Sequence, residues 1–255
     1  MRCEGYADVG ALANLRKAVV RLATLSGRPD WPIAPVERFV QQQQALVSVS
    51  HSVASRLAIL AVAFINGFVI MSIELLGGRV LAPYFGSSVH VWGSIIAVFM
   101  LSLSLGYLWG GKLSLRNPGH RTFISFFIFA ALLCLPIIYL ADPVMRTIFL
   151  SIEDPRYGSL WSAVLLYFAP ICVMGMVSPY SVRLLVLTQE HSGGVAGMLY
   201  FVSTLGSALG TLATSFYFVM WFEINQVMWG CVVALLLCAA LIAFSSRHAI
   251  KEQKS

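Results

Sequence analysis

The chain alternates between long apolar stretches and short polar connections over most of its length. Six stretches are apolar enough and long enough to cross a bilayer, and they cover residues 57–76, 90–111, 121–140, 160–188, 195–219 and 225–245. A helix needs about 20 mostly apolar residues to span the hydrocarbon core, because lipid offers no partner to unpaired backbone groups. The pattern therefore predicts an all-α polytopic membrane protein with six transmembrane helices.

The first 56 residues are more polar than the rest, and we expect them to form a cytoplasmic segment outside the membrane. Within this segment, apolar side chains recur at three- and four-residue spacing beside three cations, namely Val9, Leu12, Leu15, Val19 and Leu22 beside Arg16, Lys17 and Arg21. This spacing predicts an amphipathic basic helix, which lies either in the headgroup layer or on the protein's own cytoplasmic face. Residues 57–245 then form the membrane domain, and residues 246–255 form a cytoplasmic tail.

A shorter apolar pattern follows the third long stretch. Asp142-Pro143 resembles a helix start, and it precedes Met145, Ile148, Phe149 and Ile152 at helical spacing. Because this segment is too short to span a bilayer, it predicts a separate helix that rests on the outer membrane surface.

Lysine and arginine are distributed unevenly between the connections. When the connections are assigned to alternate sides, 14 of these cations fall on the side that holds both chain ends, and three fall on the other, namely Arg79, Arg146 and Arg156. Cytoplasmic segments carry such an excess. We therefore expect a multi-pass protein of the bacterial inner (plasma) membrane with both termini in the cytoplasm.

The composition agrees with a membrane protein, because 58% of the residues are hydrophobic and only 11% are charged. The net charge of +6 comes from cations at the ends of apolar stretches, where they meet lipid headgroups, so we expect no nucleic-acid partner. The five cysteines form no CxxC pair and have no histidine at metal-ligand spacing. We expect them to pack the interior, and we expect no metal and no cofactor.

The second and fifth stretches match when the sequence is shifted by 104 residues. Seven residues coincide, because Val91, Gly93, Val98, Leu101, Leu105, Gly106 and Leu108 fall on Val195, Gly197, Val202, Leu205, Leu209, Gly210 and Leu212. Such a match arises either from a true repeat or from apolar composition alone. A repeat unit of three helices would place the second unit upside down, and this 3+3 inverted arrangement is typical of transporters.

Both matched stretches also contain two glycines four residues apart. These are Gly106 with Gly110 and Gly206 with Gly210. The spacing allows helices to approach closely, either within the chain or in a dimer.

Two sequence blocks resemble the membrane domain of spermidine-synthase-like bacterial membrane proteins. The first runs from Glu74 to Ser88 and continues in Val91-Trp92-Gly93-Ser94, and the second runs from Gly197 to Gly210. The likeness extends from about residue 57 to residue 245. The basic loop from Gly106 to Arg121 is also similar to the loop after the second helix of major facilitator transporters. The resemblance implies a six-helix bundle like half of a major facilitator transporter.

In many members of that family, an aminopropyltransferase domain follows the helices and binds decarboxylated S-adenosylmethionine. This chain ends at Ser255 and contains no glycine-rich turn after a strand, which such a cofactor site needs. We therefore expect the membrane module without catalytic residues.

Glu74 is the first candidate for a functional residue, because an ionised carboxylate deep in an apolar helix is costly unless it is paired or faces water. Its expected partner is Arg79, His90 or a cationic ligand. The alternative is an internal ion pair or hydrogen bond that fixes helix packing.

Tyr180 and Arg183 are the second candidates, because they follow Pro179 inside the long fourth stretch. A proline there removes a backbone donor and breaks the helix, and broken helices line binding cavities in transporters. Alternatively, Arg183 marks the cytoplasmic end of that helix and reaches the headgroups.

Together these features predict a non-catalytic membrane protein that binds or translocates a small, cationic or polyamine-like solute. The predicted cavity contains Glu74, Tyr180 and Arg183, and Arg79 and His90 are further candidate ligand-binding residues. The alternative is an anchoring or interaction subunit of a larger complex. A third interpretation is the membrane subunit of an aminopropyltransferase whose catalytic chain is encoded separately. In each case we expect the lipid bilayer as a partner, together with a second copy or other membrane subunits.

Overall fold

The computed structural model describes residues 33–115, 119–185 and 192–254, and it describes side chains within 55–115, 119–185 and 193–246. All elements in this part of the chain are helices. In chain order they are α2 (Ile33–Phe85), α3 (Val89–Ser114), α4 (His120–Ser151), α5 (Pro155–Gly175), α6 (Val177–Leu185), α7 (Ser192–Ala213), a π-helical segment (Thr214–Phe218), α8 (Val219–Trp221) and α9 (Ile224–Lys254). The predicted amphipathic helix within residues 9–22 lies outside the described residues.

Six helical segments are long and apolar enough to cross a membrane, as the sequence predicted. They are Ser55–Phe85, Val89–Ser114, His120–Ser151, Pro155–Leu185, Gly193–Trp221 and Ile224–Ser246. The observed helices extend beyond most of the predicted ends. The largest extension is in α4, which continues without interruption to Ser151. The short helix predicted after Asp142 is therefore the last part of α4 and not a separate element.

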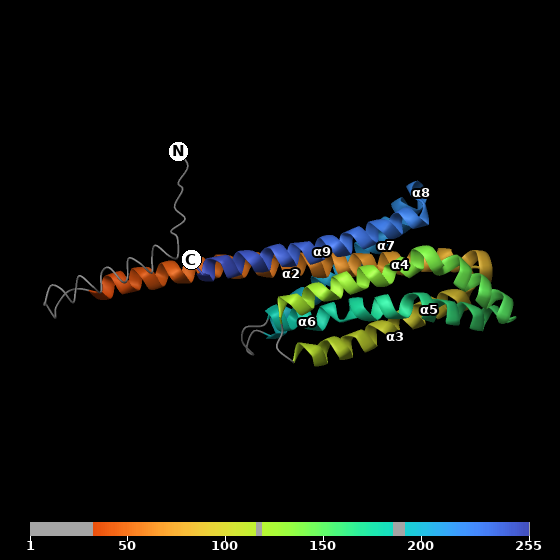
Figure 1. Ribbon diagram of the computed structural model, residues 1–255, viewed down its shortest axis with the longest axis horizontal. Coiled ribbons are helices and arrows are strands. Elements are labelled where there is room, and N and C mark those ends of the chain that lie inside the picture. The colour runs from red at the N-terminus through yellow and green to blue at the C-terminus, as the bar shows by residue number, and fades with distance from the viewer. Residues whose placement is uncertain (1–32, 116–118, 186–191, 255) are drawn as a thin grey trace. The chain divides into compact units, whose positions relative to one another are not determined.

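Contacts divide the chain into two units, one of residues 58–243 and one of residues 1–57 with 244–255. The unit of residues 58–243 contains almost all of the six spans. Within it, α5 lies between α3 and α4 (Figure 1). The connections meet at two ends: the Tyr84 end, where α2 joins α3, α4 joins α5 and α8 joins α9, and the Tyr180 end, where α3 joins α4 and α6 joins α7.

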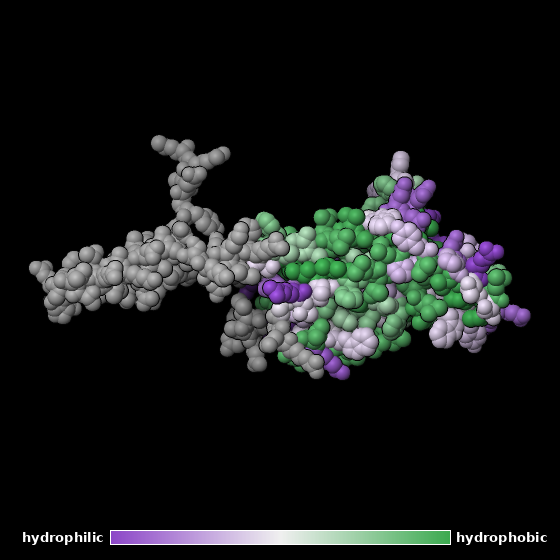
Figure 2. All heavy atoms as spheres, in the orientation of Figure 1, coloured by the Kyte–Doolittle hydropathy of each residue, from purple (hydrophilic) through white to green (hydrophobic). Residues whose placement is uncertain are grey.

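The surface of this unit is mainly apolar between the two ends. Figure 2 shows hydrophobic residues along the middle of the helices and hydrophilic residues towards both ends. Large apolar side chains such as Met100, Leu108 and Leu205 are exposed there. A soluble protein would bury such side chains, whereas lipid covers them in a membrane.

α2 and α5 supply much of the interior. The Nδ2 of Asn66 in α2 donates a hydrogen bond of 3.2 Å to the carbonyl oxygen of Met174 in α5, and the Asn66 side chain is buried. Tyr167 and Phe99 are also fully buried, with ring centroids 5.6 Å apart. Interhelical polar bonds of this kind are common in membrane bundles.

Both glycine pairs noted in the sequence lie where two helices of this chain cross. Gly106 of α3 contacts α5, and a Cβ added to Gly106 would lie 3.0 Å from the Cα of Gly175. Gly210 of α7 contacts α2, and a Cβ added there would lie 2.9 Å from the Cα of Phe68. The close approach within the chain explains the small residues.

These two crossings are equivalent under the shift of 104 residues. Gly106 lies against the carbonyl oxygen of Cys172, and Gly210 lies against the carbonyl oxygen of Phe68. The shift relates Gly106 to Gly210, and it also relates Phe68 to Cys172. The repeat suggested by the sequence is thus expressed in the packing of the helices.

A second pair of contacts follows the same rule. Gly110 lies against Met176, and the equivalent residues are Thr214 and Ser72. Thr214 and Ser72 also meet, because Oγ1 of Thr214 donates a hydrogen bond of 2.9 Å to Oγ of Ser72. For two separate contacts in one half of the bundle, the shift of 104 residues therefore gives a pair of residues that also meet in the other half. Apolar composition alone does not explain this agreement.

The sequence also explains where several helices end. α2 ends at Phe85, just before Gly86. The φ of Gly86 is 78°, in the left-handed region that favours glycine, and its N–H donates to the carbonyl of Ala82 at 2.9 Å. α5 begins after Asp154, whose side chain accepts a hydrogen bond of 2.9 Å from the N–H of Arg156.

The fourth span is interrupted at Met176, between α5 and α6. Pro179 follows three residues later and has no N–H to donate to the carbonyl of Gly175, so the helix cannot continue its regular ladder there. This confirms the predicted break in the fourth span.

Candidate functional site

Glu74 lies in α2 near the middle of its membrane-spanning segment. It precedes Phe85, the last residue of the helix, by 11 residues, which corresponds to about 16 Å along the axis. Its side chain is half-buried. Its carboxylate makes no hydrogen bond and no ion pair with any residue that the structure describes. An unpaired carboxylate at this depth is costly, and such residues usually bind a ligand, a proton or a partner.

Trp92 of α3 lies beside the face of α2 that carries Glu74. A Cβ added to Gly78 would lie 2.8 Å from Cζ2 of Trp92, so the indole rests directly on this glycine. Glu74 and Gly78 are one helical turn apart on the same face, about 6 Å from each other. The structure therefore brings a carboxylate and an aromatic ring into one region within the membrane span.

Trp92 appears in the sequence analysis only as part of the first block of the family resemblance and not as a candidate site residue. The signal that was available is Gly78, which follows Glu74 by one turn and leaves room for a large side chain from another helix. A carboxylate with a neighbouring indole attracts cations, because the charge and the negative face of the ring act together in a medium of low dielectric constant.

Arg79 does not lie on the Glu74 face. Five residues separate the two side chains, which rotates Arg79 by about 140° around the helix. Arg79 is exposed and lines a pocket of about 670 Å³ at the Tyr84 end. Two carboxylates, Asp142 and Glu223, line the same pocket.

The pocket at the Tyr84 end is partly organised by a hydrogen bond. The hydroxyl of Tyr84 donates to Oδ1 of Asp142 at 2.9 Å, which joins α2 to α4. Phe149 packs against Tyr84 with its ring centroid 6.3 Å away. Sequence reasoning missed Asp142 and Tyr84 as site residues, because their connection depends on the continuation of α4 beyond Pro143.

His90 is exposed and is the second residue of α3. It does not line the pocket at the Tyr84 end. Its carbonyl oxygen accepts a hydrogen bond of 2.9 Å from the Ser94 hydroxyl, which is a local contact of the first helical turn. The structure places His90 at the end of the helix.

Tyr180 is buried in α6 and binds the polypeptide backbone. Its hydroxyl accepts a hydrogen bond of 2.9 Å from the N–H of Gly119 and donates one of 3.1 Å to the carbonyl of Gly119. The ring stacks on Phe123 at 5.7 Å with an interplanar angle of 7°. Tyr180 thus holds the start of α4 against α6, which is a structural role.

Tyr180 and Arg183 are far from Glu74 along the bundle. Gly77, next to the Glu74 face, lies against the ring of Tyr167, and Tyr180 follows Tyr167 by 13 residues, about 20 Å along the axis. Arg183 is exposed in the last turn of α6. The structure therefore does not bring these two residues together with Glu74 in one cavity.

The fold and the six membrane-length helices define a polytopic helical membrane protein. Comparison with protein-family models, with curated proteins and with solved structures found no match for the chain. The likeness to spermidine-synthase-like membrane proteins remains a prediction from the two sequence blocks.

Proposed function

We propose that this protein binds a small organic cation, of the polyamine type, at Glu74 and carries it into or across a membrane. The observation that supports this proposal best is the half-buried carboxylate, which lies near mid-span and has no charged partner among the described residues. Removing one charge from water without compensation costs several kcal/mol. A bound cation supplies the compensation that the chain itself does not provide there.

Trp92 and the apolar surroundings favour an organic cation over a metal ion. Metal ions of the Mg²⁺ and Ca²⁺ type need several oxygen ligands, whereas an ammonium group is bound by one carboxylate and an aromatic face. The resemblance to spermidine-synthase-like proteins agrees with a polyamine. The proposed location is the bacterial inner membrane with both termini in the cytoplasm, based on the excess of cations on that side.

The solute site also requires a second wall. The span Gly193–Trp221 has only 17% of its most apolar stretch buried in the chain, compared with 56% for Ser55–Phe85. α7 and α2 are in direct contact at Gly210 and Phe68. A second copy of the chain, packed on α7, would enclose the region near Glu74 as the second half of a transporter does.

The low burial of this span also favours a second candidate function. An anchoring subunit would use the exposed side of α7 to hold unrelated proteins in the membrane. The two functions differ in the partner that covers α7, and in whether Glu74 is needed for solute binding.

Binding of radiolabelled spermidine to the purified protein in lipid nanodiscs tests the proposal. Glu74→Gln keeps the size of the side chain and removes its charge, and we expect it to weaken binding at least about tenfold, because a charge-assisted hydrogen bond contributes roughly 1.5–3 kcal/mol. Glu74→Asp should retain part of the affinity. Glu223→Gln is the control, since it removes a carboxylate at the Tyr84 end.

Equal binding by the unchanged protein and by Glu74→Gln would refute a role for this carboxylate. Gentle extraction followed by native mass measurement then separates the two functions. A homodimer agrees with transport. A stable complex with unrelated chains, in a protein that binds no organic cation, would replace the proposal with the anchoring function.

A further inference from the structure

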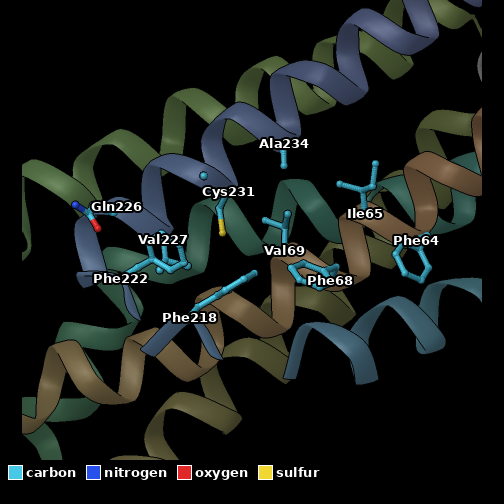
Figure 3. A pocket seen from close by; sticks show the side chains of 11 residues that line it. Phe64, Ile65, Phe68, Val69, Phe218, Phe222, Gln226, Val227, Cys231 and Ala234 are labelled. Atoms are coloured by element: carbon cyan, nitrogen blue, oxygen red, sulfur yellow. The ribbon is translucent and has the colours of Figure 1, made fainter. Parts of the chain in front are cut away.

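A second cavity lies among the membrane-spanning helices, at a place that the proposed function does not use. It has a volume of about 440 Å³ and lies between α2, the π-helical segment and α9. Figure 3 shows Phe64 and Phe68 of α2, Phe218 of the π-helical segment, and Val227 and Cys231 of α9 around it. Gln226 is its one lining residue with a polar side chain apart from the thiol of Cys231.

The internal repeat shows which residues of α4 correspond to those of α9 at the cavity. The shift of 104 residues relates Val227, Gly230 and Cys231 of α9 to three phenylalanines of α4, namely Phe123, Phe126 and Phe127. All three phenylalanines are buried, and the rings of Phe123 and Phe126 pack against Tyr180 at 5.7 and 5.1 Å. At the cavity, α9 therefore carries smaller residues than its counterpart α4, whereas Phe68 and Phe218 on the facing side are larger than their counterparts Cys172 and Ser114.

The cavity opens to the surface of the bundle. Gly230, Gln226 and Phe222 at its margin are exposed. Gly230 and Gln226 belong to a membrane-spanning segment and Phe222 to the short turn that precedes it, so the cavity opens to the lipid from the Tyr84 end inwards. Water has almost no polar partner inside it, and an apolar cavity of this kind stays free of water.

We infer that this cavity binds one acyl chain of a bilayer lipid. A space of 440 Å³ has room for about 15 groups of the size of a water molecule or methylene. The lining runs from Gln226 to Ala234 along α9, which is about 12 Å. The hydrocarbon fills the space that the small α9 residues Gly230 and Cys231 leave open, and it supplies the dispersion contacts that an empty cavity would lose.

The polar end of the cavity, at Gln226, is where the lipid headgroup would lie if the lipid enters from the Tyr84 end. Oε1 of Gln226 accepts a hydrogen bond of 3.2 Å from the N–H of Glu223, so the side chain is fixed at the first turn of α9. A headgroup lies at the level of this turn when the acyl chain extends towards Ala234. The tail therefore lies along α9, and the headgroup remains at the membrane surface.

Photocrosslinking with a phosphatidylcholine that carries a diazirine in its acyl chain tests this inference. The full chain is reconstituted in nanodiscs, illuminated and digested, and the adducts are located by mass spectrometry. We expect adducts on residues 64–69 and 227–234 well above those on Met100 and Leu101, which are exposed on α3. Equal labelling of the two regions would overturn the proposal, because it would mean that lipid contacts the cavity only as it contacts any exposed face.

Two variants fill the cavity with the residues of its own counterpart. Gly230→Phe and Cys231→Phe introduce the side chains found at positions 126 and 127, and each should lose most of the adducts on residues 64–69. Val233→Phe is the matched control, because Val233 is 50% exposed and does not line the cavity.

Adducts on residues 64–69 that persist in both filling variants would overturn the proposal. If neither variant folds, the comparison of residues 64–69 with Met100 and Leu101 in the unchanged chain still decides the question. Native mass spectrometry of the unchanged protein provides a second measurement. A retained phospholipid supports the inference, whereas an apolar compound that is not a lipid, retained in its place, contradicts it.

Discussion

Replacing the glycines at the two equivalent helix crossings tests the packing of the bundle most directly. In Gly106→Ala the added Cβ meets the Cα of Gly175 at 3.0 Å, and in Gly210→Ala it meets the Cα of Phe68 at 2.9 Å. Both distances are shorter than ordinary carbon–carbon contacts of about 3.5–4.0 Å. Each neighbour is backbone, which cannot rotate away as a flexible side chain would.

The helices must therefore move apart, and forcing extra volume into a packed interior costs roughly 1–3 kcal/mol. Because the two crossings are equivalent under the repeat, we expect Gly106→Ala and Gly210→Ala to lower the free energy of unfolding by similar amounts. The loss can be measured by titration of the folded protein from mild detergent into sodium dodecyl sulfate, followed by circular dichroism.

The chain provides a control pair related by the same shift. Gly93 of α3 and Gly197 of α7 have no atom within 4 Å of an added Cβ. Gly93→Ala and Gly197→Ala should be neutral, or stabilising by up to about 1 kcal/mol, because alanine loses less backbone freedom than glycine in a helix. If the control variants lost as much stability as Gly106→Ala and Gly210→Ala, the close crossings would not be the reason for the glycines.

Two further substitutions examine single hydrogen bonds. Tyr180→Phe removes both bonds to Gly119 but keeps the ring stacked on Phe123. We therefore expect the free energy of unfolding to fall by about 1–2 kcal/mol and the Gly119 amide to exchange its hydrogen faster. An unchanged exchange rate would show that the hydroxyl does not hold this connection. Thr214→Val removes the donor to Ser72 in the contact between the π-helical segment and α2, and it should cost about 0.6–1.5 kcal/mol in thermal unfolding experiments. The double variant Thr214→Val/Ser72→Ala should lose less than the sum of the single variants, and strict additivity would argue against the bond.

The number and approximate position of the spans could be predicted from the sequence, because apolar length decides whether a helix can cross lipid. The ends were less predictable. Pro143 is compatible with the first turn of a new helix and also with the interior of a longer one. In the structure α4 continues through it, and Tyr84 bonds to Asp142 from another helix. Such a contact over 58 residues has no signature in the local pattern.

The depth of Glu74 was predictable for the same reason as the spans, but its surroundings were not. The separation of Arg79 from the Glu74 face follows from the helical period alone, and could have been inferred from the spacing of five residues. The role of Tyr180 could not be inferred, because its partner is the backbone of Gly119, and every residue type except proline offers the same N–H and C=O. The neighbour of Gly78 was also hidden, since a glycine indicates free space and does not indicate which side chain occupies it.

The two glycine crossings have a consequence for the biogenesis of the protein. Both crossings, and also the bonds from Asn66 to Met174 and from Thr214 to Ser72, join the first three spans to the last three. A nascent chain that has left the ribosome only as far as Ser151 can form none of these contacts. Its first spans must wait in the lipid until the second half has been synthesised, and until then Asn66 lacks the carbonyl of Met174 that accepts its hydrogen bond.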